Sequence, residues 1–430
     1  MPHAVCSSFW LLLLATAMPA AAQTEWRERL TEAIRRATAQ NPQVREAEAR
    51  VEAARRRVPQ AAVLPDPEVE LGLKDVPVRA PSLSRDDFTM EMLTGRQRLP
   101  GRGKRSVMQA AAQAGVESAG AMRARQVIEI AADTADAFFS LAETDRSLAI
   151  LEDARHRLED AAASATELYK VGKAGQSDVL QASLEKTSLD EQLSTLRAER
   201  RAQAARFNTL QGLPAGAPVP PIGPVEPGSE VPAAADLVER AAARSPAVAA
   251  AQAEVQRAEQ ELALARLEGR PDWMLMGYYG RRERFDDFIG VSASINLPWA
   301  HRRRLEERRA EKEADLTAAR AGVETVSNQL QGDIEVAYAE LEKNREQARL
   351  YRDSILPQAE INFRAAREAY IVGKIDFLTL LRAAANLDLY RRQAAARSTD
   401  IGRALAALQK ASGLPLIEGT PDSGESNVEK

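Results

Sequence analysis

The amino-acid sequence predicts a mainly α-helical protein with a small β part, built from two similar halves. One motif occurs twice: Tyr169–Lys173 has the sequence YKVGK and Tyr370–Lys374 has YIVGK, and the copies align without a gap at an offset of 201 residues. Each copy lies between long helix-forming stretches and contains a glycine, which disfavours an uninterrupted helix. The sequence therefore predicts a helix–turn–helix tip in each half, at about 171–176 and 372–377.

Composition excludes some classes of function. The chain has 62 acidic and 58 basic residues, so no nucleic-acid partner is expected. Its residues are 45% hydrophobic but only 5% aromatic, with 28% charged, which is typical of long alanine-rich helices.

The N-terminus has the pattern of a signal peptide. An apolar run from Phe9 to Ala17 is followed by small residues at Ala20–Ala22, which predicts a segment 1–22 that is removed on export. The alternative, a membrane anchor, is disfavoured because ~10–14 apolar residues are too few to span a bilayer. Cys6, the single cysteine, would leave with this segment, so no disulfide or cysteine-bound metal is expected.

Each half begins with helices and continues into a pair of strands. Asn41-Pro42 and Ser245-Pro246 are helix-start signals at matching places in the two halves. Alternating apolar and polar residues then predict strands at about 67–75 and 87–98, and again at about 272–280 and 288–297. We expect the apolar residues of each strand to share one face and Glu68, Glu70 and Glu91 to lie on the opposite, polar face.

A basic cluster follows each second strand. Leu99-Pro100 precedes GRGKR, and Leu297-Pro298 precedes WAHRRR. Two interpretations are open: solvated charges at the start of a helix, or the boundary between a membrane-embedded part and the periplasm.

Very long helices are predicted at about 103–171 and 301–372, each about 100 Å long at 1.5 Å per residue. Apolar residues seven apart, such as Leu141 and Leu148, predict lateral packing of the coiled-coil type, and Pro357 predicts a local kink. Shorter helices return from each tip. The resulting organisation is a first repeat at 23–213, a Pro/Gly-rich linker at 214–232, a second repeat at 233–415 and a disordered tail at 416–430.

Four strands cannot close a membrane barrel, which needs at least about eight. Three chains would supply twelve strands, and the same trimer would give the long helices the lateral neighbours that their heptad spacing requires. The sequence thus predicts a single oligomeric tube, with a lipid-embedded β-barrel at one end and a cylinder of long helices below it.

The sequence resembles the TolC family of outer-membrane efflux ducts over nearly its whole mature length. The resemblance rests on the duplicated helix–hairpin–helix order, the Asn/Ser-Pro helix starts, the Tyr-x-Val-Gly tips and a Gly-Leu-Pro at the end of each half, Gly212–Pro214 and Gly413–Pro415. The stretches LPGRGKR and PDPEVE are most similar to the heavy-metal efflux branch. The resemblance implies a homotrimer in which a twelve-stranded transmembrane β-barrel is joined to a periplasmic α-helical barrel. It also implies a passive channel in the bacterial outer membrane, extending into the periplasm, that works with a periplasmic adaptor protein and an inner-membrane pump of the RND type.

The resemblance also implies roles for the tips. The adaptor-contacting turns would be Val171, Gly172, Lys173, Val372, Gly373 and Lys374; the alternative is that the glycines only close helical hairpins. A periplasmic gate would use Tyr370 and Asp178, joined by a hydrogen bond, with Asp376 as a further charge, against the alternative of a plain solvated tip. The family's gate arginine is replaced by Ile375, and its ring aspartates by Thr379 and Arg382. Glu68, Glu70 and Glu91 would line the barrel lumen, unless they are simply exposed to solvent.

No catalytic site, metal site or cofactor is predicted. The histidines are His3, which would leave with the signal peptide, His156 and His301. His156 lies on a long helix, and no second histidine or cysteine is near it in sequence. The expected function is therefore conduction of substrates such as heavy-metal cations or drugs, without chemistry. The alternatives are an outer-membrane channel for type I protein secretion and, from a different class, a soluble periplasmic coiled-coil scaffold; a periplasmic enzyme comes third.

Overall fold

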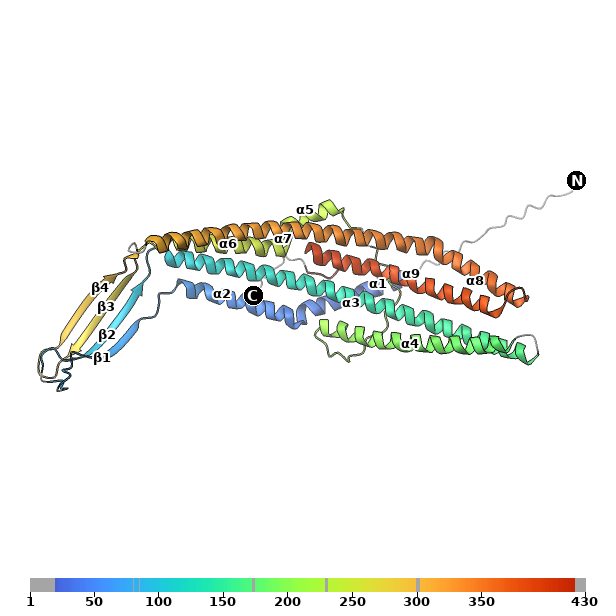
Figure 1. The fold of residues 1–430 in the computed structure, drawn as a ribbon, viewed down its shortest axis with the longest axis horizontal. Helices are drawn as coiled ribbons and strands as arrows, with labels where there is room; N and C mark the ends of the chain where they lie inside the picture. The colour runs from blue at the N-terminus through green and yellow to red at the C-terminus, as the bar shows by residue number, and fades with distance from the viewer. Residues whose placement is uncertain are drawn as a thin grey trace.

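A computed structural model describes residues 20–421 except 80, 85, 172–174, 229–230 and 299–301. The protein is elongated, with a four-stranded sheet at one end and two helical hairpins at the other (Figure 1). Most of the expected signal peptide, 1–22, and the tip residues Gly172 and Lys173 lie outside the described residues. No described helix combines the length and the apolar content needed to cross a membrane.

The two halves follow the same order of helices and strands, except that the long helix of the second half is divided in two, which confirms the duplicated, mainly helical fold. The first half contains α1 (Ala20–Gln40), α2 (Pro42–Ala62), β1 (Glu68–Lys74), β2 (Met90–Leu99), α3 (Lys104–Lys170) and α4 (Gln176–Leu210). The second contains α5 (Ala234–Arg244), α6 (Pro246–Leu267), β3 (Trp273–Arg281), β4 (Phe288–Ile295), α7 (Arg302–Leu350), α8 (Leu356–Ile371) and α9 (Phe377–Ser412).

The Asn/Ser-Pro signals act as expected at the starts of α2 and α6. The side-chain oxygen of Asn41 accepts a hydrogen bond from the amide of Gln43 at 2.8 Å, and Ser245 Oγ accepts one from Ala247 at 3.3 Å. Proline is well suited to the position after each cap, where the helix needs no N–H.

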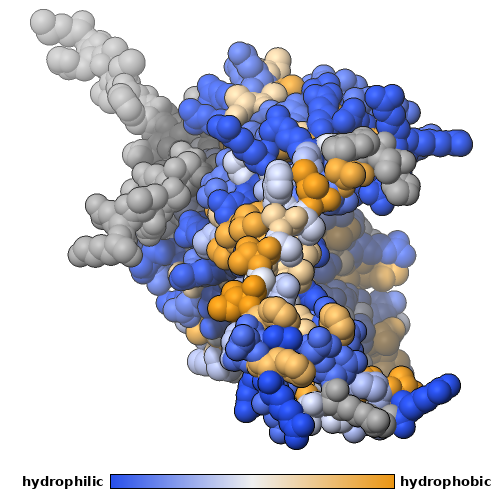
Figure 2. All heavy atoms as spheres, turned by 90° about the vertical axis from the view of Figure 1, so that its left-hand side faces the viewer, coloured by the Kyte–Doolittle hydropathy of each residue, from blue (hydrophilic) through white to orange (hydrophobic). Residues whose placement is uncertain are grey.

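The sheet is antiparallel throughout, in the order β1-β2-β3-β4, so the two hairpins join through β2 and β3. Directly opposite residues point to the same face. The register therefore places Leu71, Leu93 and Tyr279 together on one face with Ile289. This apolar face is exposed: Leu71 is 84% and Val291 82% accessible. Seen from the sheet end, hydrophobic side chains gather in a band between hydrophilic regions (Figure 2).

The prediction that Glu91 shares the polar face with Glu68 and Glu70 is wrong. Glu91 lies opposite Leu73 on one side and Arg281 on the other, so it belongs to the apolar face. It forms an ion pair with Arg281 at 3.3 Å, near the loop end of the sheet. The residues that point to the polar face from β2 include Met90 and Met92, whose apolar character misled the sequence-based assignment of the strand's phase.

The helix α3 is unbroken over 67 residues, or roughly 100 Å. Two pairs of leucines seven residues apart are buried: Leu141 with Leu148, and Leu151 with Leu158. All but Leu141 belong to a cluster near the tip that includes Leu189 of α4 and Phe377 of α9. The helical hairpin at the far end is therefore held by an apolar seam.

The long helix of the second half is not continuous as far as the tip. After α7, residues Tyr351–Ile355 form a π-helical turn, in which the amide of Leu356 donates to the carbonyl of Tyr351. Pro357 follows in the first turn of α8. Because proline lacks an N–H and its ring clashes with the carbonyl four residues earlier, the helix accommodates it by widening there.

The two repeats contact each other along α3 and α9. Gly402 of α9 lies so close to Phe139 of α3 that a Cβ atom added to the glycine would be 2.5 Å from the phenyl ring. Ion pairs run along the same seam: Arg403 with Asp136 at 3.1 Å and Lys410 with Asp133 at 3.0 Å.

The Pro/Gly-rich linker forms no helix or strand in its described part, yet it is fastened to the helices. The buried carboxylate of Asp145 in α3 accepts a hydrogen bond from the amide of Ile222 at 2.8 Å, and Arg29 of α1 donates to the carbonyls of Pro220 and Pro221. The side chains of Ile222 and Val225 are buried in the main core.

The prediction of a disordered tail at 416–430 is wrong for its first residues. The amides of Leu416 and Ile417 donate to the side-chain oxygen of Gln409 at 3.0 and 2.9 Å. Ile417 also packs against the core beside Trp26. These hydrogen bonds satisfy the buried side-chain oxygen of Gln409 and hold the segment against α9.

Candidate functional site

The hairpin tips present apolar side chains to solvent. Val171 and Val372 occupy equivalent positions at the ends of α3 and α8, and each is 65% exposed. Tyr169 and Ile371, next to them, are also exposed. Apolar side chains such as valine and isoleucine are not stabilised by contact with water. These exposed residues therefore form a candidate contact surface for another protein.

The turn of the second tip depends on a glycine. Gly373 has φ = +73°, and its amide donates to the carbonyl of Tyr370 at 2.9 Å. The amide of the exposed Lys374 donates to the carbonyl of Ala369 at 2.8 Å, which completes a left-handed helix end. Gly373 is therefore structurally required here, whatever else the tip contacts. The matching Gly172 and Lys173 lie outside the described residues.

Two of the predicted gate residues, Asp178 and Asp376, cap the helices that leave the tips. In the first repeat, the Asp178 carboxylate accepts a hydrogen bond from the amide of Gly175 at 3.2 Å. In the second, the Asp376 carboxylate accepts one from the amide of Thr379 at 2.9 Å. The Thr379 hydrogen bonds hold the pKa of Asp376 below its ordinary value. Both carboxylates therefore cap a helix N-terminus: Asp376 is itself the N-cap residue of α9, and Asp178 is the third residue of α4 and reaches back to its N-cap.

The third predicted gate residue, Tyr370, packs on the core of the tip. Its ring lies 5.6 Å from that of Phe377 between centroids, and it contacts the apolar seam of α3 and α4. Burial, together with the negative charge of Asp178, raises the pKa of the Tyr370 phenol. No hydrogen bond joins Tyr370 and Asp178 among the described residues of one protomer, so the structure brings the two near each other without linking them.

A groove of about 550 Å³ separates the two hairpins just behind the tips. Arg157 of α3 crosses it and donates to the carboxylate of Asp388 on α9. Asp388 is only 12% exposed, and burial raises its pKa even though the charge of Arg157 opposes that shift. This pair was not predicted from the sequence, because 231 residues separate its members and no local pattern marks either of them.

The polar face of the sheet carries Glu68 and Glu70 as predicted, and both are exposed. Glu70 pairs with Arg96 of the neighbouring strand at 2.7 Å. This ion pair neutralises one charge on the face, and Glu68, the other carboxylate of β1, forms no ion pair with any residue that the structure describes.

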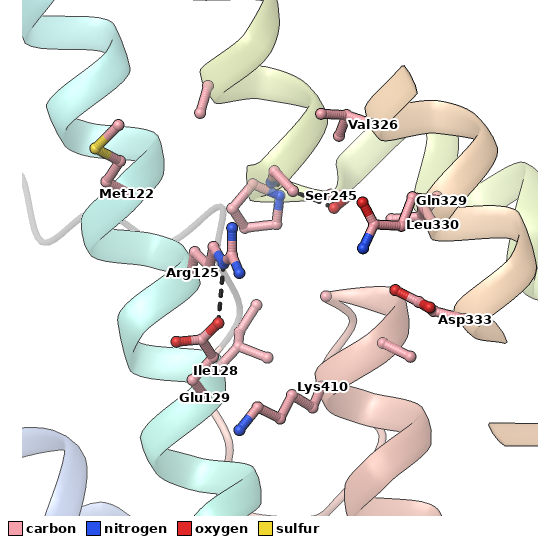
Figure 3. A pocket seen from close by; sticks show the side chains of 15 residues that line it. Met122, Arg125, Ile128, Glu129, Ser245, Val326, Gln329, Leu330, Asp333 and Lys410 are labelled. Atoms are coloured by element: carbon pink, nitrogen blue, oxygen red, sulfur yellow. Dashed lines mark hydrogen bonds and ion pairs between the residues drawn. The ribbon is translucent and has the colours of Figure 1, made fainter. Parts of the chain in front are cut away.

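A smaller cavity, of about 270 Å³, lies where α3, α6, α7 and α9 meet (Figure 3). Its charged side chains are largely neutralised: Arg125 pairs with Glu129 at 2.9 Å, and Lys410 pairs with Asp133. Within the described part of the chain, no group of three or more His, Cys, Asp or Glu residues could hold a metal ion. His156 is exposed and lies 3.6 Å from Glu159.

Comparison with known proteins assigns the chain to a family. The model of the outer membrane efflux protein family matches residues 33–213 and 237–414. The protein therefore belongs to the outer membrane efflux protein family, as the resemblance implied, and its location is that of this family: the outer membrane, extending into the periplasm. No curated protein matches it by sequence.

Solved structures show the same fold. The outer membrane protein VceC of Vibrio cholerae has a TM-score of 0.74 at 19% identity, covering 91% of this chain and 98% of that one. The CmeC outer membrane channel of Campylobacter jejuni has a TM-score of 0.76 at 14% identity, covering 99% and 95%. CusC has a TM-score of 0.72 at 14% identity, covering 90% and 92%. At these identities the similarity concerns the fold, and it does not single out a branch of the family.

Proposed function

We propose that three copies of this chain assemble into a passive outer-membrane duct of a tripartite efflux pump. The observation that supports this most strongly is the sheet: β1 and β4 each have one edge without a partner in the described chain, and one face of the sheet is apolar and exposed. Isolated strand edges and a wide apolar face are unstable in water. Twelve strands from three chains would pair the edges and place the apolar face in lipid.

The apolar tips support a partner at the periplasmic end. A trimer would present six quasi-equivalent tips built around Val171 and Val372, which fit helical hairpins of a periplasmic adaptor. The adaptor would link the duct to an inner-membrane pump of the RND type. Tyr370, Asp178 and Asp376 surround the same end, where they would form the gate, and Glu68 and Glu70 would face the lumen.

Extraction and assembly test the duct. The mature protein should require detergent for extraction, behave as a trimer by light scattering and form ion-conducting pores in planar bilayers. A monomer that stays in plain buffer and has no affinity for lipid would contradict the proposal and favour the soluble scaffold.

The docking surface has its own test. Val171→Asp together with Val372→Asp should abolish export while leaving trimers and pore conductance intact. Val78→Asp, which changes an exposed valine in the loop at the other end, is the control and should export normally. Full export by the double variant would remove the adaptor-contact assignment.

Substrate class and pump type are tested in cells. The proposed substrates are heavy-metal cations or drugs, and a deletion strain should become sensitive to one of these classes. Loss of a secreted protein from the medium, without any change in sensitivity, would instead favour type I secretion.

A further inference from the structure

Five exposed arginines surround the boundary between the sheet and the long helices. Residues 101–105 and 302–305 together contain six basic residues and no acidic residue. One of the six, Lys104, is 12% exposed and pairs with Asp272 at 2.7 Å, so it has a structural role. The other five form what we call the basic collar: Arg102, Arg105, Arg302, Arg303 and Arg304, all exposed.

The collar arginines are unpaired although acidic groups are close in sequence. None of the five forms an ion pair with another described residue, whereas Arg308, one turn further along α7, pairs with Glu311 at 2.9 Å. The chain can thus pair arginines in this region, and it leaves the collar uncompensated.

Helix stability does not account for the collar. Neither α3 nor α7 has an acidic residue in its first turn, and basic residues stand there instead. Positive charge near a helix N-terminus is disfavoured by the helix dipole. The collar therefore weakens the start of both helices slightly, which points to a compensating interaction outside the chain.

The position of the collar indicates what that interaction is. The apolar face of the sheet ends at Leu99, Trp273 and Ile295. The collar begins three residues after Leu99 and seven residues after Ile295, where β2 and β4 lead into the long helices α3 and α7 (Figure 1). The opposite end of the sheet differs: residues 74–89 and 281–287 contain six basic and six acidic residues. Arg281 there pairs with Glu91, and Arg282 donates to the carbonyl of Asp87 at 2.9 Å. Uncompensated positive charge thus borders the apolar face at the helix end of the sheet.

We propose that the basic collar binds the phosphate headgroups of anionic phospholipids in the leaflet that faces the periplasm. The inference rests on the proposed function, because the apolar face must lie in lipid for the collar to reach headgroups. Guanidinium groups bind phosphate oxygens in a bidentate manner, and arginines just outside the hydrocarbon layer are attracted to an anionic surface. The collar would fix the depth of the duct and so the height at which the tips meet their partner.

Lipid titration tests the collar. Detergent-solubilised full-length protein would be titrated with dansyl-phosphatidylglycerol and, as the neutral reference, dansyl-phosphatidylcholine. Arg302→Gln/Arg303→Gln/Arg304→Gln should weaken phosphatidylglycerol binding roughly 100-fold, since three charges near the surface are lost, and leave phosphatidylcholine binding unchanged. Arg102→Gln/Arg105→Gln, on the other long helix, should give a smaller loss.

The matched control removes three exposed arginines elsewhere: Arg201→Gln/Arg240→Gln/Arg244→Gln. It changes the net charge equally, so equal lipid binding by the control and the collar triple variant would overturn the inference.

Planar-bilayer recordings separate the collar inference from the proposed duct function. If the wild-type protein forms pores but the collar triple variant binds phosphatidylglycerol normally and changes the ion selectivity of the pore, the arginines face the lumen and the collar inference alone fails. If the wild-type protein forms no pores, the proposed function fails.

Discussion

Arg157 of α3 donates a hydrogen bond to Asp388 of α9, and this ion pair joins the hairpin of the first repeat to that of the second. Arg157 also pairs with Asp153 on its own helix. The nearby Arg155 makes a different set of contacts, pairing with Asp190 of α4 at 2.7 Å and so staying within the first hairpin. Arg157 therefore links the two hairpins, whereas Arg155, two residues earlier, links the two helices of the first hairpin.

Replacing Arg157 by alanine should loosen the contact between the hairpins. Asp388 would remain mostly buried without its partner, which costs about 1–3 kcal/mol and corresponds to roughly 5- to 150-fold faster local opening. Hydrogen exchange of the α9 amides around Asp388 measures this effect. Arg155→Ala is the control and should speed exchange between α3 and α4 while leaving α9 unchanged; the same exchange pattern in both variants would contradict the separate roles.

As the pH is lowered, the Asp388 carboxylate should take up a proton at a higher pH than an ordinary aspartate does. Its raised pKa means that the folded protein holds the proton more tightly than the unfolded chain does. The stability contributed by protonation is therefore fully present below the unfolded pKa and is lost as pH rises through the folded pKa. The groups that act on Asp388 are Arg157 and Asp153 of α3 and Arg391 of α9.

The difference in free energy of unfolding between the wild type and Asp388→Asn should change with pH between the ordinary aspartate pKa and the raised pKa of Asp388. At higher pH this difference should be constant. Exchange rates of α9 measured from pH 4 to 7 in both proteins provide the test. Parallel profiles would show that Asp388 titrates normally.

Which face of the sheet each residue of β2 occupies can be tested with single cysteines in a Cys6→Ala background. Met92 points to the polar face and Leu93 to the apolar face. In lipid, Met92→Cys should react with a bulky water-soluble thiol reagent and Leu93→Cys should not. The opposite result would restore the sequence-based phase, in which Glu91 lies on the polar face.

Gly402→Ala should destabilise the seam between the repeats. The added methyl group would meet the Phe139 ring at 2.5 Å, and overpacking of this kind typically costs about 1–3 kcal/mol. Thermal unfolding in detergent should show a lower midpoint, partly restored by Phe139→Leu in the same chain. Gly332→Ala is the control, because a methyl group there meets no atom within 4 Å, and it should leave the midpoint unchanged or raise it.

Much of the fold could be predicted because its signals are local. Asn41 and Ser245 start helices through hydrogen bonds to residues two positions away, and the repeated YxVGK motif marks both turns at the tips. Alternation located all four strands to within about three residues. The tip residues Val171 and Val372 were found in the same way, since a turn between two long helices is exposed almost by necessity.

The phase of β2 and the roles of the tip carboxylates needed the structure. Methionine suits either face of a sheet, so Met90 and Met92 did not reveal the side on which they lie; pairing with β1 and β3 decided it. Asp178 and Asp376 could be placed at the tips, but their work as helix caps depends on backbone geometry in the turns.

The sequence by itself determined the duplicated order of helices and strands, the tips and the family, because these depend on patterns that act over a few residues or repeat along the chain. Tertiary structure alone decided which face Glu91 occupies, how the linker is fastened and that Arg157 meets Asp388. These contacts form only after elements far apart in the sequence have docked, such as α3 with α9 or β2 with β3. Their energies depend on burial and on partners tens to hundreds of residues away.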